Sequence, residues 1–284
     1  MVSKVWFITG ASKGFGMELT RAALETGDRV IATARNPKTI QDALGGLDRL
    51  MVLKLDVTSE QQAREAVNAA LKQFGQIDIL VNNAGRGLLG AVEEVTAEEV
   101  RSAMAVNVEG TLNVSRAVLA SMRARRSGHI LNLSSVGGFA AWPGWGIYCA
   151  TKFMVEGFSE AMHAELKPLG IKVTIVEPGV FRTEFLEESS LARATNIIKD
   201  YSETAGAARS WVDNWRNAQP GDPRKAALAM VKITQVENPP LRLQLGADCV
   251  SAVETKLIQV KQELEKWREL AESTAFNVVA AGTE

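Results

Sequence analysis

The segment with the clearest capacity for chemistry is YCATK, which places Tyr148 and Lys152 four residues apart. On an α-helix this spacing brings the phenol and the ammonium group onto one face, one turn apart. A free tyrosine has a pKa of about 10 and exchanges protons poorly near neutrality, whereas a neighbouring positive charge stabilises the phenolate and lowers that pKa. Such a pair is common in helices, so its interpretation as an acid–base pair depends on the residues around it.

Two further polar residues, Ser135 and Asn107, accompany this pair. Ser135 lies thirteen residues before Tyr148, just past the strand-like run ILNLS, where its hydroxyl can face the same cleft. Asn107 interrupts an apolar stretch of a long predicted helix, residues 97–122. Because Asn is unfavourable inside helices, it indicates either a specific polar task or a buried amide whose hydrogen bonds are satisfied.

The run TGASKGFG at residues 9–16 joins a predicted strand to a predicted helix. Its glycines permit a tight turn and let backbone N–H groups approach a phosphate at the positive end of the helix. A purely structural turn is the alternative. The position of the run in a strand–helix–strand pattern favours a dinucleotide site.

The residues after the second predicted strand indicate which dinucleotide would bind. The run TARN at residues 33–36 contains no carboxylate for a ribose 2′-hydroxyl, but it contains Arg35. Arginine can form a forked contact with a 2′-phosphate, and Lys13 in the glycine loop can add a second positive charge. Each could instead be a solvated surface cation. Together they predict NADPH/NADP+ as the cofactor.

Short apolar runs alternate with helix-length amphipathic segments along most of the chain, which predicts a parallel sheet. Several runs are apolar throughout, as expected for strands covered on both faces. The sequence therefore predicts an α/β, doubly wound (Rossmann) fold with a seven-stranded parallel sheet, helices on both faces and a single domain. The strands are expected at residues 4–9, 29–34, 51–55, 77–81, 129–133, 172–176 and 241–245, with helices at 16–25, 60–73 and 97–122 among others.

Two segments depart from this alternation. Residues 181–222 form a long connection that contains Phe185, Tyr201, Trp211 and Trp215. Long connections are often lids, so we expect a substrate lid here within a catalytic domain of residues 1–246; a surface helical excursion is the alternative. Residues 247–284 include the charged run VKQELEKWREL and are expected to form a helical extension packed on the same domain.

The composition excludes several classes of protein. The 32 Lys and Arg residues against 33 Asp and Glu residues give a net charge of −1, so neither nucleic acid nor an anionic membrane is an expected partner. Two cysteines and two histidines, without metal-ligand spacing, predict no disulfide framework and no metal site. No apolar run is long enough to span a membrane, and the start MVSKVWFITG contains no signal peptide. We therefore expect a cytoplasmic protein.

Seven motifs follow one another along the chain: TGASKGFG at residues 9–16, LDV around Asp56, NNAG at 82–85, Asn107, SS at 134–135, YCATK at 148–152 and PGVFRT at 178–183. In order and spacing they resemble those of the short-chain dehydrogenase/reductase family, from Val5 to about Thr183. The run TARN and the long segment after PG make the chain similar to NADPH-dependent hydroxysteroid dehydrogenase-like and carbonyl-reducing members.

The resemblance implies a role for each candidate residue. Ser135 would bind and polarise a carbonyl, Tyr148 would donate or accept a proton, and Lys152 would bind the nicotinamide ribose and tune Tyr148. Asn107 would hold a water molecule in a proton relay. Asp56 and Val57 would hold the adenine, residues 83–85 the adenosine ribose, and residues 178–183 the nicotinamide. The expected cofactor residues are Gly10, Ser12, Lys13, Gly14, Phe15, Gly16, Arg35, Asp56, Val57, Asn83, Ala84, Gly85, Tyr148, Lys152, Pro178, Gly179, Val180 and Thr183.

The predicted activity is NADPH-dependent, reversible reduction of a ketone or aldehyde to an alcohol. A bulky hydrophobic substrate is expected because several apolar side chains fall near the expected cleft. They are Leu88, Leu89, Phe139, Trp142, Trp145, Phe181 and Phe185, any of which could instead belong to the core.

The alternative function is a non-catalytic NADP-binding sensor or regulatory protein, which usually lacks the tyrosine or lysine. An enoyl reductase would space these two residues more widely, and a sugar epimerase usually has a larger C-terminal substrate domain. The tail puts in doubt the tetramer that many relatives form, because it could cover the edge that they use. A homodimer through the helices that hold Asn107 and Tyr148, or a monomer, remains open.

Overall fold

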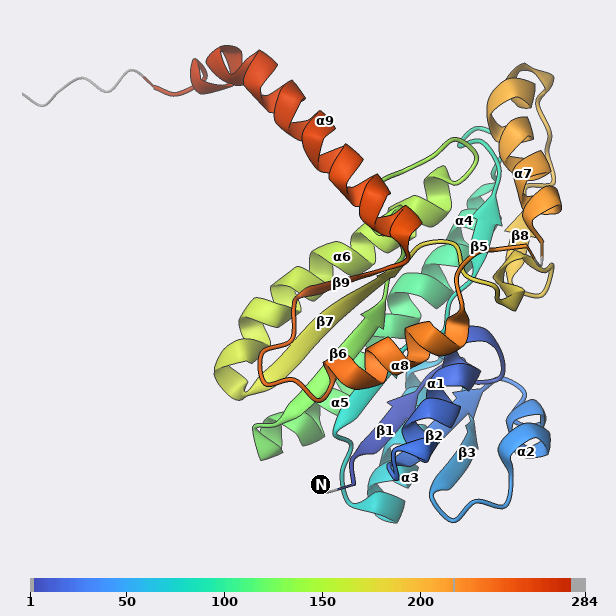
Figure 1. Cartoon of the computed structure of the whole chain (residues 1–284), viewed down its shortest axis with the longest axis vertical. Helices are drawn as coiled ribbons and strands as arrows, with labels where there is room; N and C mark the ends of the chain where they lie inside the picture. The colour runs from blue at the N-terminus through green and yellow to red at the C-terminus, as the bar shows by residue number, and fades with distance from the viewer. Residues whose placement is uncertain (1–2, 217, 277–284) are drawn as a thin grey trace, which may run out of the picture.

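The computed structural model describes residues 3–216 and 218–276, and its centre is a sheet of seven parallel strands (Figure 1). The strands are in the order β3-β2-β1-β4-β6-β7-β9, so the order along the chain reverses between β1 and β4. All seven predicted strands are confirmed, with shifts of one or two residues at most ends. Their bounds are β1 Val5–Ile8, β2 Arg29–Ala34, β3 Leu50–Lys54, β4 Ile79–Asn82, β6 Gly128–Leu133, β7 Ile171–Pro178 and β9 Arg242–Leu245.

Helices cover both faces of this sheet, which confirms the predicted doubly wound, single-domain fold. On one face, Trp6 and Ile8 of β1 pack in a core with α1 (Gly14–Glu25) and α8 (Pro223–Ile233). The alternating residues of β1, Val5 and Phe7, pack on the other face, whose helices are α3 Glu60–Phe74, α5 Gly110–Arg125 and α6 Gly146–Leu166. Since both faces are buried, the strands need no polar alternation.

The helix predicted over residues 97–122 is instead interrupted. Thr96 and Glu99 form a capping box that starts α4 (Ala97–Met104), and a π-helical segment, η1 (Ala105–Glu109), separates α4 from α5. A π-helical turn inserts an extra residue and re-aims the side chains around it, and such turns often mark functional sites. Asn107 lies inside this segment, so the prediction of one continuous helix is wrong where the candidate residue sits.

Residues 181–216 and 218–222 form a separate layer over the carboxyl ends of the strands (Figure 1). Two three-residue strands that the sequence did not reveal, β5 (Gly87–Leu89) and β8 (Leu191–Arg193), pair in parallel and anchor this layer. Leu89, Leu186, Leu191 and Val212 form a small core beneath α7 (Ala207–Trp215). The remaining short elements are α2 Lys38–Leu44, η2 Val136–Gly138, η3 Lys167–Leu169, η4 Glu184–Leu186, η5 Lys199–Tyr201 and η6 Ser202–Gly206.

The last helix, α9 (Ala247–Glu272), projects away from the domain (Figure 1). Cys249 and Val253 are buried at its base, but every residue from Leu257 to Phe276 is exposed. The expectation that residues 247–284 pack on the domain therefore holds only for the first two turns. The helix starts at the carboxyl end of the edge strand β9 and continues past the body, and its side chains from Leu257 onward are exposed among the described residues. Residues 277–284 lie outside the described residues.

None of the helices in residues 3–216 and 218–276 is both long and apolar enough to cross a membrane.

Candidate active site

One large cavity, of about 1070 Å³, lies between the carboxyl ends of the strands and the layer of residues 181–222. It spans the point beside β1 and β4 where the strand order reverses, which is where open α/β sheets usually bind ligands. Its volume is at the upper end of the range for small-molecule sites. All the predicted site residues line it except Gly16 and Asn107, both of which lie directly behind it.

The glycine loop is packed tightly against the loop that follows β4. Asn83 donates hydrogen bonds from Nδ2 to the carbonyl oxygens of Thr9 and Gly10, at 2.8 and 3.0 Å. A Cβ on Gly16 would lie only 2.6 Å from the same Nδ2 atom, so a side chain there would separate the two loops. Gly16 thus permits the close packing that sets the shape of the cavity, although it does not line it.

The N-terminus of α1 opens into this cavity and is suited to an anion. Among the described residues, Lys13 at the N-cap makes no capping side-chain bond, and the first turn of α1 contains no acid. The first N–H group, that of Gly14, donates to the Glu184 carboxylate at 3.0 Å. Free N–H groups and the helix dipole favour negative charge at such an end. The contact from Glu184 was not foreseen from the sequence, although this residue directly follows the PGVFRT motif.

The two cations expected to select a 2′-phosphate differ in their surroundings. Lys13 donates a hydrogen bond from Nζ to Ser189 Oγ at 2.6 Å, so it connects the glycine loop to the segment over the cavity. Arg35 is exposed at the cavity wall and makes no hydrogen bond or ion pair with any of the described residues. Asp56 lies nearby and accepts hydrogen bonds from the backbone N–H and the hydroxyl of Thr58 at 3.0 and 2.8 Å.

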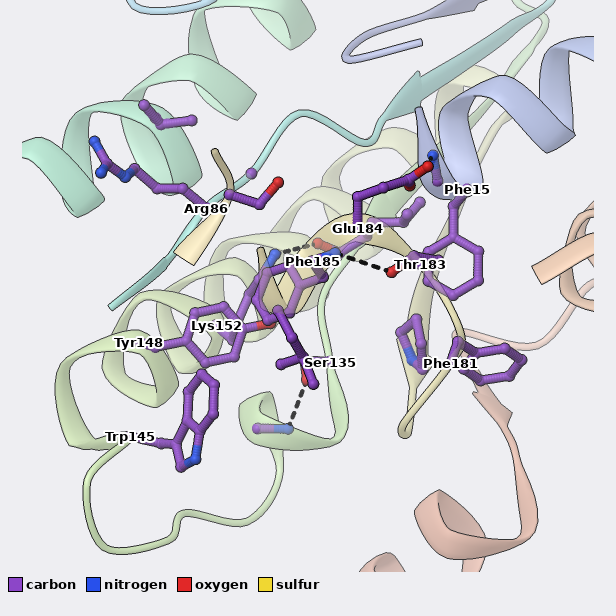
Figure 2. A pocket seen from close by; sticks show the side chains of 18 of the residues that line it. Phe15, Arg86, Ser135, Trp145, Tyr148, Lys152, Phe181, Thr183, Glu184 and Phe185 are labelled. Atoms are coloured by element: carbon purple, nitrogen blue, oxygen red, sulfur yellow. Dashed lines mark hydrogen bonds between the residues drawn. The ribbon is translucent and has the colours of Figure 1, made fainter. Parts of the chain in front are cut away.

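Tyr148 is held between two aromatic rings beside Ser135 (Figure 2). The centroid of its ring lies 5.7 Å from that of Trp145 and 5.5 Å from that of Phe185. Ser135 Oγ accepts a hydrogen bond from the Gly137 N–H at 3.0 Å. The sequence prediction that Ser135 and Tyr148 meet in one cleft is therefore consistent with their positions.

Burial, rather than the neighbouring lysine, dominates the electrostatics of the tyrosine. Burial raises the pKa of Tyr148 well above its ordinary value, and the nearby Ser135 hydroxyl opposes this rise only in part. The expectation of a net lowering by Lys152 is wrong for this structure. Lys152 Nζ lies 5.9 Å from the centroid of the Tyr148 ring and donates to the carbonyl of Leu133 at 2.7 Å. Burial also lowers the pKa of Lys152 to about 8, although the negative charge of Glu156 acts to raise it.

Asn107 is a buried amide with its hydrogen bonds made within the protein. It accepts from the Arg86 N–H at 2.8 Å and donates to the Arg86 carbonyl and to Thr151 Oγ1, each at 2.9 Å. Because Thr151 lies on α6 between Tyr148 and Lys152, Asn107 connects the loop after β4 to the helix that bears these two residues. These contacts are those expected of a buried amide whose hydrogen bonds are made within the protein. The role of Asn107 in a water relay stays a prediction.

A buried charge cluster lies one helical turn behind Lys152. Arg242 Nε lies 3.0 Å from Glu156 Oε2 and 3.2 Å from Glu177 Oε1. Arg242 Nη2 lies 2.8 Å from Glu160 Oε1. Burial, together with the charge of Glu156, raises the pKa of Glu177 to about 7. The cluster joins α6, β7 and β9, and thereby holds the helix that bears Tyr148 and Lys152. No sequence motif indicated it.

The part of the cavity beyond Tyr148 is largely apolar. Of the seven apolar residues expected at the cleft, Trp142, Trp145, Phe181 and Phe185 line it. Leu88 and Leu89 are instead buried core residues of β5, and Phe139 does not line the cavity. The covering segment adds Leu186, Ala207, Ala208 and Trp211.

The covering segment is tied down by a buried carboxylate, Glu94, which the sequence did not single out. Glu94 accepts hydrogen bonds from the Ile198 N–H at 3.0 Å and from Arg209 of α7 at 2.8 Å. The hydrogen bond from Arg209 is the main reason that the pKa of Glu94 falls to about 2. The carboxylate therefore stays charged and holds the segment at any ordinary pH.

Within residues 3–216 and 218–276 there is no group of three His, Cys, Asp or Glu side chains that could hold a metal ion.

Comparison with known proteins identifies the family to which this site belongs. The model of the short chain dehydrogenase family matches residues 4–194. The chain is 37% identical over 246 residues to a 3-ketodihydrosphingosine reductase of Bacteroides thetaiotaomicron, a match that covers 87% of this chain and 89% of that protein.

Solved structures give the same result. The crystal structure of a short-chain dehydrogenase from Streptomyces avermitilis superimposes with a TM-score of 0.91 at 40% identity, covering 97% of this chain and 100% of that one. The closed form of a serine dehydrogenase complexed with NADP+ has a TM-score of 0.72 at 27% identity, covering 85% of this chain and 94% of that one.

Proposed function

This chain belongs to the short-chain dehydrogenase family, and we propose that it reversibly reduces a bulky, hydrophobic ketone or aldehyde with NADPH. The observation that carries the proposal is the group of Ser135, Tyr148 and Lys152 on the wall of one cavity, whose opposite end is the glycine loop. A non-catalytic NADP-binding sensor would not need these three side chains.

The residues at the glycine loop fit a dinucleotide. The N–H groups at the start of α1 face the cavity and suit a diphosphate. Arg35 and Lys13 would contact a 2′-phosphate, while Asp56 and Val57 line the adjoining wall, where they would hold the adenine. When bound, NADPH would supply the hydride.

The chain's own groups would supply the remaining chemistry. Ser135 would donate a hydrogen bond to the substrate carbonyl, whose oxygen becomes negative as the hydride is transferred. Tyr148 would donate a proton to the same oxygen. Because burial raises its pKa, Tyr148 keeps its proton near neutrality and is in the state that reduction requires. Oxidation requires the phenolate and is expected to need a higher pH.

The apolar part of the cavity supports the substrate class. Trp142, Trp145, Phe185 and Trp211 offer large surfaces with few polar groups, which favours a bulky hydrophobic compound. The relative that reduces 3-ketodihydrosphingosine, by its name, supports including long-chain ketones among the candidates.

The test is NADPH consumption with aromatic, long-chain aliphatic and polycyclic ketones, in parallel with NADH. Tyr148→Phe keeps the ring between Trp145 and Phe185 but removes the hydroxyl, so turnover should fall by about 10²–10⁴-fold while NADPH still binds. Full activity in this variant would contradict the proton-donor role. Tight NADPH binding without turnover on any ketone would favour the non-catalytic sensor. Equal use of NADH, or an unchanged cofactor ratio in Arg35→Asp, would contradict the cofactor assignment.

A further inference from the structure

Helix α9 projects from the domain (Figure 1), and most of its large apolar side chains are exposed. The exposed fractions of its large apolar side chains beyond the base range from 48% at Val260 to 62% at Leu270. The others are Leu257, Ile258, Leu264 and Trp267. Contiguous apolar surface of this kind usually marks an interaction site.

The spacing of these residues is that of a coiled coil. Apolar residues occupy positions 250, 253, 257, 260, 264, 267 and 271, in alternating steps of three and four. Such a, d spacing over three heptads forms one stripe along a helix, suited to a second helix. We call Val250, Leu257, Val260, Leu264 and Trp267 the α9 stripe. Val253 continues it onto the domain, where this side chain is buried.

The charged residues that flank the stripe indicate which partner helix fits. Glu254 and Lys261 flank it on one side, and Lys256 and Glu263 flank it on the other. In an antiparallel pair with Leu257 opposite Val260 of a second copy, Glu254 meets Lys261 and Lys256 meets Glu263. Two-fold symmetry repeats each pair, so four pairs of opposite charge would form.

The other orientation fits less well. In a parallel pair, Lys256 would face Lys261 of the second copy, and the only flanking pair of opposite charge would be Glu263 with Arg268. The antiparallel register also places Trp267 opposite the small Val250, so that large and small side chains alternate. We propose that α9 binds α9 of a second copy of this chain as an antiparallel, two-stranded coiled coil.

This arrangement brings the second copy to the edge of the cavity. The overlap of residues 250–267 corresponds to about 27 Å of helix. Leu270 of the partner subunit would lie beside Ala247, next to Asp248. The Asp248 carboxylate lines the cavity and accepts a hydrogen bond from the Val180 N–H at 2.7 Å. The dimer would therefore hold the segment of residues 178–183 from outside. The inference does not depend on the reaction proposed above.

Sedimentation velocity of the full chain tests the interface. The wild type should sediment as a dimer in the micromolar range, and Leu257→Glu with Leu264→Glu should raise the dimer Kd by more than about a hundredfold. Because both side chains are exposed in the single chain, the domain should still fold. Ile258→Glu is the control, since Ile258 is 59% exposed but lies outside the stripe. A monomeric wild type, or a double variant that stays dimeric, would overturn the proposal.

Charge reversal and disulfide formation test the orientation. Glu254→Lys should weaken the dimer about three- to tenfold, and Glu254→Lys with Lys261→Glu should restore it. Mixing a Val250→Cys protein with a Trp267→Cys protein should give a disulfide between the two. Each variant alone should give none, because identical positions lie about 26 Å apart in the antiparallel pair. Disulfides within each single variant, with no disulfide between the two different variants in the mixture, would show a parallel pair and refute this register.

Discussion

Arg242 lies outside the cavity, and the structure predicts that its removal destabilises the fold. Its guanidinium lies within 3.2 Å of the carboxylates of both Glu156 and Glu177. The side chain of Glu156 is 7% exposed and that of Glu177 is 0% exposed. Replacing Arg242 with Met preserves most of the side-chain volume but leaves two buried carboxylates without their positive partner.

The size of the effect follows from this burial. Breaking a buried ion pair by removing one partner costs about 3–5 kcal/mol of unfolding free energy. The third contact adds little, because Glu160 is 54% exposed and exposed pairs contribute about 0–1 kcal/mol. We therefore expect Arg242→Met to lower the unfolding free energy by about 3–5 kcal/mol at pH 8.

The loss should depend on pH with a definite sign. The pKa of Glu177 is about 7 in the folded protein, above its ordinary value, so the folded state binds more protons than the unfolded state between these values. Stability therefore falls as pH rises through this range. Without Arg242 the pKa of Glu177 rises further, so the loss of stability grows as pH rises from 5.5 to 8 and levels off once that pKa exceeds the pH. At pH 5.5 the carboxyl is protonated in both proteins, and the loss should be smaller.

Urea unfolding at pH 5.5 and pH 8 measures both quantities. Arg268→Met on α9 is the matched control, because its ion pairs are exposed and its loss should stay below about 1 kcal/mol. Adding Glu177→Gln to Arg242→Met should recover part of the stability at pH 8. An Arg242→Met loss no larger than that of the control, or equal at both pH values, would refute the assignment of buried, charged carboxylates.

Three further predictions concern the cavity. Gly16→Ala should raise the Kd for NADPH at least about tenfold, because the added Cβ pushes the glycine loop away from the loop after β4. Gly157→Ala is the control, since its Cβ meets nothing within 4 Å, and calorimetry that gives the two variants the same Kd would contradict the prediction. The pKa of Lys152 is about 8, so kcat/KM for NADPH should fall as the ammonium is lost above that pH, and a flat profile to high pH would show that its charge is not needed. Glu184→Gln removes a negative charge at the start of α1, so it should tighten NADPH binding about three- to tenfold, with the largest effect at low salt. Glu187→Gln, at an exposed position, is the control, and weaker NADPH binding by the Glu184 variant would contradict the prediction.

Much of the fold was predictable because its signals are local. Apolar runs such as those containing Val5 and Ile130 must be buried on both faces, and the turn chemistry of TGASKGFG is specified by neighbouring residues. The parallel order then follows from right-handed crossovers. The π-helical segment at Asn107 was not predictable, because an inserted turn leaves the apolar periodicity almost unchanged and depends on contacts with Arg86 and Thr151. The strands β5 and β8 were missed because three residues carry no periodicity.

Local sequence is enough to place Ser135, Tyr148 and Lys152 at the carboxyl edge of the sheet, because helix spacing and strand ends are properties of neighbouring residues. The tertiary structure alone decided the protonation of those groups, because the pKa of Tyr148 depends on burial between Trp145 and Phe185, which are distant from each other in sequence.

It also decided the partners of Glu94 and Arg242, since each contacts residues that are close only after the chain has folded. The heptad spacing of α9 was already present in the sequence, but the structure showed that its stripe is left exposed, because the helix extends beyond the domain that would otherwise cover it. Residue types and local spacing set the chemistry that is available, while desolvation and long-range contacts set the charge and position at which each group works.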